Sequence, residues 1–94
     1  MSYNYKDLEI TFKKVTFSGS DYLYIRQYDR NIQDSEERES LIYIELKNFY
    51  FKKDGKVLTI GNHLGQLYSL TSYSDSMLKR WINEMTNVIS FPSV

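Results

Sequence analysis

Apolar and polar residues alternate along most of this chain, which is the pattern of strands with one buried face. In residues 8–12 the apolar side chains take every second position, and the alternation resumes at Val15 and Phe17 in the opposite phase. One extra residue in a strand redirects every side chain beyond it, so this change of phase predicts a β-bulge at Lys13 and Lys14.

The same alternation recurs in further segments of the chain. They lie at residues 22–28, 41–46, 49–51, 57–60 and 67–71. Turn residues connect them, and Asp54-Gly55 matches a type I′ turn, whose two central residues both take positive φ. Residues 29–40 are mostly polar and follow neither period, which predicts an exposed loop.

The final segment changes to the period of a helix. Ser74, Asp75 and Ser76 offer N-cap acceptors before it. Its apolar residues form one stripe with helical spacing: Leu78, Trp81, Ile82, Met85, Val88 and Ile89. Strands followed by one helix predict an α+β fold. Because one stripe cannot cover both faces of a large sheet, we expect a curled antiparallel sheet or a partly open barrel. It would have six to seven strands and one C-terminal amphipathic helix as its cap, in a single domain over residues 1–94.

The composition narrows the class of protein. The 94 residues include no cysteine, which excludes disulfides and thiolate metal sites. No apolar run approaches the roughly 20 residues that cross a bilayer, and the start MSYNYKDLEI lacks the pattern of a signal peptide. We therefore expect no transmembrane segment and a cytoplasmic location, either free or peripheral on a membrane. The nine tyrosines fit the half-buried surfaces of a sheet.

The net charge of zero is unevenly distributed. Residues 31–40 carry four acids and one base, so the rest of the chain carries 11 bases and 8 acids. The balance argues against nucleic acid as a partner, because such binding depends on excess Lys and Arg. The acidic segment lacks the spacing of a Ca²⁺ loop, so we expect no metal there. It is either a solvated connector or a contact for a basic partner.

The C-terminal part resembles the end of a pleckstrin-homology (PH) domain. Residues 66–72 form a Y-x-L strand, and residues 74–82 add a polar link and a helix with a central Trp81. Residues 12–25 resemble the second and third strands of that family, and the order of elements agrees over residues 8–90. The resemblance implies that Trp81 plugs the end of the barrel. Only residues 3–6 remain for the first strand of the family, so we expect a compact or divergent member.

The resemblance also implies a phosphoinositide ligand. Lys13, Lys14 and Arg26 are our candidates for binding the phosphates, with the hydroxyl of Tyr24 and with Lys6 as additional donors. The family's basic motif, [KR]-x-R on the second strand, is absent. Each basic residue near an anionic membrane contributes only about 1 kcal/mol, so we expect weak recruitment within a larger protein or assembly.

Two functions stay open for this chain, phosphoinositide binding and protein docking. Lys13 and Lys14 could be a solvated bulge and Arg26 an exposed strand residue; the same scaffold would then be a protein–protein docking module with no lipid binding. An enzyme is not expected, because His63 lies in a turn segment without a nucleophile or carboxylate in a recognisable arrangement. No cofactor is expected either.

Overall fold

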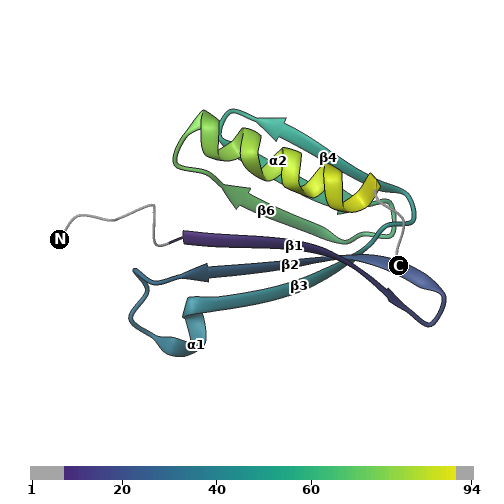
Figure 1. Ribbon diagram of the computed structural model, residues 1–94, viewed down its shortest axis with the longest axis horizontal. Coiled ribbons are helices and arrows are strands. Elements are labelled where there is room, and N and C mark those ends of the chain that lie inside the picture. Colours follow the sequence, from purple (N-terminus) through teal and green to yellow (C-terminus); the bar gives the residue numbers. More distant parts are fainter. Residues whose placement is uncertain (1–7, 91–94) are drawn as a thin grey trace.

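The computed structural model describes residues 8–90, and all statements below concern those residues (Figure 1). In chain order the elements are β1 (Leu8–Phe17), β2 (Ser20–Asp29), α1 (Ser35–Arg38), β3 (Glu39–Glu45), β4 (Phe49–Asp54), β5 (Val57–Asn62), β6 (Leu67–Thr71) and α2 (Asp75–Ser90). The α+β class and the order of strands before one C-terminal helix are confirmed. The resemblance's first strand and Lys6 lie outside the described residues.

The six strands form two antiparallel sheets of three strands each. Sheet A has the order β1-β2-β3 and sheet B the order β4-β5-β6. The expected single curled sheet or barrel is therefore divided, and the strands do not close into a barrel. The division falls at residues 46–48, where Asn48 takes a φ of 58° and the Phe49 N–H donates to the Leu46 carbonyl. This tight turn separates the β4 ladder from the β3 ladder.

The β1–β2 hairpin has no bulge, so the expected bulge at Lys13 and Lys14 is wrong. Its register runs without interruption from Leu8 opposite Asp29 to Phe17 opposite Ser20. The turn residues Ser18 and Gly19 both take positive φ (52° and 80°), as in a type I′ turn, which matches the twist of the strands. The change of hydrophobic phase therefore means that apolar residues beyond Phe12 occupy the opposite face of the same regular strand.

The β4–β5 hairpin is confirmed, but its expected turn type is wrong. Asp54 pairs with Val57, so Gly55 and Lys56 are the central residues of the turn. Gly55 has a φ of 59°, whereas Lys56 is not among the described residues with positive φ. Positive φ at the first central position alone is the pattern of a type II′ turn, in which that position is glycine.

The expected loop at residues 29–40 contains the short helix α1. The Asp34 carboxylate caps it by accepting the Glu36 N–H at 2.9 Å. Arg38 donates to the carbonyls of Ile32 and Gln33, which links the helix to the residues that precede it. Local side-chain hydrogen bonds of this kind have no period, so the hydrophobic pattern could not reveal the helix.

The core lies between the inner faces of both sheets and α2. It contains Leu8, Phe12, Leu23, Ile25, Ile44, Leu58, Ile60, Leu70, Met77, Leu78, Trp81 and Met85. α2 begins after Ser74, whose hydroxyl accepts the Met77 N–H at 3.1 Å, and it packs mainly against β1. In Figure 1 it runs in front of sheet B and above sheet A. The expected helix and its apolar stripe are confirmed.

Two side chains join the two sheets, one from Asn62 at the end of β5 and one from Gln66 in the β5–β6 connection. Asn62, which is 2% exposed, donates from Nδ2 to the Glu45 carbonyl at 3.0 Å. Gln66 accepts the Glu45 N–H at 3.0 Å and donates to the Tyr43 carbonyl at 3.1 Å. These side chains therefore satisfy backbone groups at the end of β3 that no neighbouring strand pairs.

Candidate docking surface on sheet A

The two faces of sheet A have different surroundings. Because successive residues of a strand point to opposite sides, β1 presents Leu8, Ile10 and Phe12 to the core and presents its odd-numbered residues to the other side. We call that other side the outer face. From β2 and β3 it receives Tyr22, Tyr24, Arg26, Tyr28, Leu41 and Tyr43 in its middle, with Ser20, Glu39 and Glu45 at its ends. An antiparallel sheet with one solvated face normally has polar residues there, so this composition is unusual.

Lys13 and Lys14 lie on opposite faces of sheet A. Lys13 is on the outer face opposite Tyr24, and its ammonium lies 5.9 Å from the centroid of the Tyr24 ring. Lys14 is opposite Leu23 on the side of the core and is half-buried. In a regular strand, neighbouring residues cannot converge on one phosphate group. The structure therefore brings Lys13 to Tyr24 but separates Lys14 from both.

Arg26 shares the outer face with Lys13 and Tyr24, but its guanidinium already has partners. It lies 2.6 Å from the Glu39 carboxylate, to which both Nε and Nη2 are directed. It also lies over the ring of Tyr28, 5.0 Å from the centroid. An anion at this position would compete with Glu39 for the same donors, which lowers the positive potential available to a phosphate.

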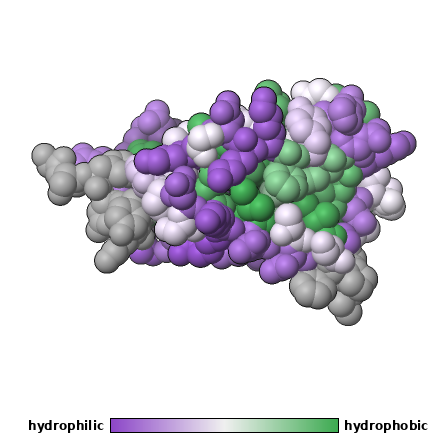
Figure 2. Space-filling view, turned by 90° about the horizontal axis from the view of Figure 1, so that it is seen from above, coloured by the Kyte–Doolittle hydropathy of each residue, from purple (hydrophilic) through white to green (hydrophobic). Residues whose placement is uncertain are grey.

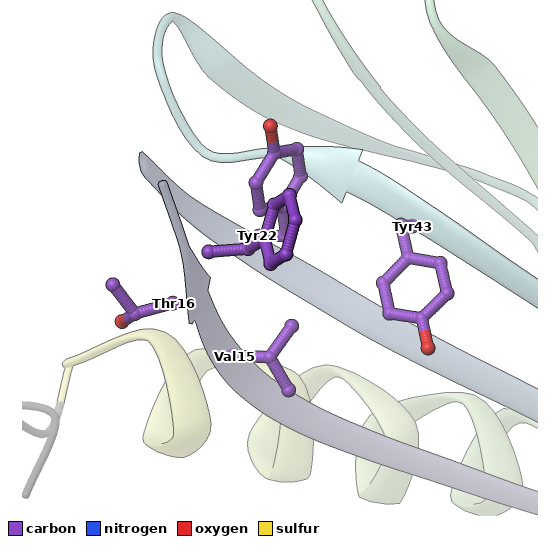
Figure 3. A pocket seen from close by; sticks show the side chains of 5 residues that line it. Val15, Thr16, Tyr22 and Tyr43 are labelled. Carbon is purple, nitrogen blue, oxygen red and sulfur yellow. The ribbon is translucent and has the colours of Figure 1, made fainter. Parts of the chain in front are cut away.

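The outer face contains a hollow at the end distant from α1. Val15, Thr16, Phe17, Tyr22 and Tyr43 line it, so all three strands of sheet A contribute (Figure 3). It is open to solvent and has a volume of about 400 Å³. Apart from Thr16 its side chains are apolar or aromatic, and it can therefore hold an apolar group more readily than a phosphate.

Several side chains in and beside this hollow are exposed, whereas Val15 and Tyr22 are half-buried. Phe17 has 72% of its surface accessible and Tyr43 has 51%, and the neighbouring Leu41 has 52%. The Tyr24 and Tyr43 rings are in edge-to-face contact, with their centroids 5.4 Å apart, which fixes their orientation. The sequence analysis missed this surface. The change of phase at Val15 and Phe17 could have indicated this surface, but a bulge was predicted from it instead.

A second apolar region lies between β4 and α2. Phe49, Tyr50, Phe51, Thr86, Ile89 and Ser90 line a groove there. Figure 2 shows hydrophobic side chains gathered on the face seen from above, which includes α2 and β4.

Trp81 is buried, with 2% of its surface accessible, and lies in the core beside β1. A further hollow on that side, between β1 and α2, is lined by Leu8, Glu9, Ile10, Thr11, Arg80, Trp81 and Glu84. Within residues 8–90 no three His, Asp or Glu side chains gather in a group that could hold a metal ion. Neither described helix has the length and apolar character that crossing a membrane requires.

Comparisons with protein-family models, with curated proteins and with solved structures give no match for this chain. The arrangement of two small antiparallel sheets and a C-terminal helix is compatible with a PH-like fold. The membership itself stays a prediction.

Proposed function

We propose that this chain is a non-catalytic protein-docking module, and that the outer face of sheet A binds an extended segment of a partner protein. The observation that carries the proposal is the exposed hollow of Val15, Thr16, Phe17, Tyr22 and Tyr43. Contiguous apolar side chains at a surface favour interaction with another macromolecule. Tyrosine and arginine are also enriched among the residues that contribute most to binding energy in interfaces.

The geometry supports docking better than recognition of a phosphoinositide headgroup. A headgroup site needs several donors that converge on the phosphates. Here Lys14 projects to the face opposite Lys13, and Arg26 is bonded to Glu39. Weak phosphoinositide binding stays a prediction, now resting on Lys13 and Tyr24, with Lys6 outside the described residues.

The proposal is tested by selecting peptides from a random phage-displayed library against the immobilised chain. The selected peptides are then synthesised and titrated into the ¹⁵N-labelled chain. We expect amide shifts centred on Val15, Phe17, Tyr22 and Tyr43. A selection that gives no peptide above background, or peptides whose shifts map to the groove between β4 and α2, would contradict the proposal.

A matched pair of variants makes this test specific. Phe17→Ser removes a 72% exposed ring from the hollow, and Leu64→Ser removes a 56% exposed side chain from the β5–β6 connection. Neither change empties the core, so both variants should fold. We expect the selected peptides to lose affinity for the first variant and to keep it for the second.

A further inference from the structure

Within residues 8–90, no strand other than β2 pairs with β3, so the backbone groups around Leu41 that face away from β2 have no strand partner there. β3 is the terminal strand of sheet A and forms its lower border in Figure 1. The Leu46 N–H donates to the Asp21 carbonyl, so the even-numbered residues of β3 direct their backbone groups to β2. The odd-numbered residues therefore direct their N–H and C=O groups away from the sheet.

Side chains cover only the end of this edge. Gln66 and Asn62 satisfy the outward groups of Glu45 and the carbonyl of Tyr43. Leu41 precedes Tyr43 by two residues on the same strand, and its side chain is 52% exposed. Its N–H and C=O are thus presented at an accessible strand edge.

The middle of this edge lacks charged side chains and proline, since the charged residues of β3, Glu39 and Glu45, lie at its two ends. Sheets commonly place lysine or proline on exposed edge strands to prevent the addition of another chain. The terminal strand β4 of sheet B carries Lys52 and Lys53, whereas β3 has neither lysine nor proline between Glu39 and Glu45. The side chains of Leu41 and Tyr43, whose backbone groups face this edge, lie on the outer face.

We propose that an extended segment of the partner adds to the edge of β3 as a fourth strand of sheet A. This inference rests on the proposed docking function and specifies how the partner binds. The backbone of the added segment would pair with Leu41. Its side chains on the outer face would lie beside Leu41 and Tyr43. Because the Tyr43 ring is one wall of the hollow, a large apolar side chain of the added strand can fill that hollow.

The charge at the start of β3 indicates the chemistry of this segment. Glu36 and Glu37 of α1 are exposed directly before the strand, and Asp34 caps the same helix. A partner segment with an apolar centre and Lys or Arg at the end beside α1 therefore complements this edge.

One pairing of this edge with a second copy of the chain opposes like charges. In an antiparallel pairing of two β3 strands that places Leu41 opposite Tyr43 of the second copy, Glu39 falls opposite Glu45. Like charges directly opposite each other destabilise a strand pair. The exposed acids of α1 make a basic and apolar segment of a different protein the favoured occupant.

The test uses the peptide selected from the phage library, synthesised with one N-methyl group at each backbone position in turn. N-methylation removes a donor and adds bulk at the strand edge, and alternate amides of a strand point in opposite directions. We expect alternate positions to lose affinity by about tenfold or more, and the positions between them to be unaffected. The Leu41 amide should also become protected from hydrogen exchange in the complex.

Protein variants provide a second readout. Leu41→Pro removes an outward N–H at an edge position where proline is tolerated, and should lower the affinity to a similar extent. Glu36→Gln/Glu37→Gln should weaken binding several-fold, whereas Glu84→Gln on α2 should not. The N-methyl series keeps the proposal falsifiable if Leu41→Pro does not fold.

The outcomes separate this inference from the proposed function. If every N-methyl peptide binds equally while Phe17→Ser abolishes binding, docking stands and strand addition is overturned. If no peptide is selected, both are overturned. A dimer of the free chain that Leu41→Pro dissociates would overturn the identity of the occupant.

Discussion

Lys13 and Lys14 are adjacent in the sequence but lie on opposite faces of sheet A, with Lys13 beside the Tyr24 ring and Lys14 opposite Leu23. The regular register of β1 is the cause, since a strand without a bulge alternates its side chains. A pair of lysines that looks like one cationic cluster in the sequence therefore divides between the core side and the outer face. The consequence for function can be measured with vesicles.

Because these donors do not converge, we expect no specific recognition of phosphoinositide headgroups. The chain should sediment equally with vesicles containing phosphatidylinositol 4,5-bisphosphate and with vesicles brought to the same surface charge with phosphatidylserine. Lys13→Ala and Lys14→Ala are compared in the same assay, because they remove one lysine from each face of sheet A. A preference for the phosphoinositide that both variants abolish would contradict this expectation and show a specific headgroup site.

Trp81 should contribute strongly to stability. It is 2% exposed and lies within the core formed by α2 and both sheets. We expect Trp81→Ala to lower the free energy of unfolding by about 3–5 kcal/mol, measured by urea denaturation. Arg80→Ala, at the exposed neighbouring position, is the control and should change it little. A loss below about 1 kcal/mol for Trp81→Ala would mean that α2 does not dock as described.

Asn62 should stabilise the connection between the sheets. Its Nδ2 donates to the Glu45 carbonyl, and its Oδ1 accepts the N–H groups of Leu64 and Gln66. Asn62→Ala leaves these backbone groups without that partner, so we expect a loss of about 1–3 kcal/mol in the free energy of unfolding. Asn83→Ala on the exposed face of α2 is the matched control. Equal, small effects of both changes would argue against a role for Asn62 in joining the sheets.

The start of α2 offers a more local test. The Ser74 hydroxyl accepts the Met77 N–H at 3.1 Å, as an N-cap does. Ser74→Ala should cost about 1 kcal/mol in urea denaturation, and Ser74→Asp should retain most of the stability because a carboxylate also caps a helix. A variant with alanine that is as stable as the parent chain would show that this cap is not needed.

The sequence predicted the strands and the C-terminal helix well, because those depend on a hydrophobic period that is local. It could not predict which of two causes changed the phase at Val15. A bulge and a switch of the apolar residues to the outer face give the same sequence pattern, and only the pairing of β1 with β2 distinguishes them. α1 was missed because its cap and Arg38 act through hydrogen bonds, which leave no hydrophobic period.

The division into two sheets was also beyond a one-dimensional pattern. It depends on the positive φ of Asn48 and on side-chain hydrogen bonds between residues far apart in the sequence, such as Gln66 and Tyr43. Similarly, Met77 lies off the main apolar stripe of the helix but is 7% exposed and belongs to the core. Tertiary packing decides such positions.

The most direct test of the docking surface is isothermal titration of the selected peptide into the parent chain and into Phe17→Ser and Leu64→Ser. We expect Phe17→Ser to raise Kd by about tenfold or more, which corresponds to about 1.4 kcal/mol, and Leu64→Ser to leave Kd unchanged. Equal affinity for all three chains, or a larger loss with Leu64→Ser, would contradict the assignment of docking to the outer face of sheet A.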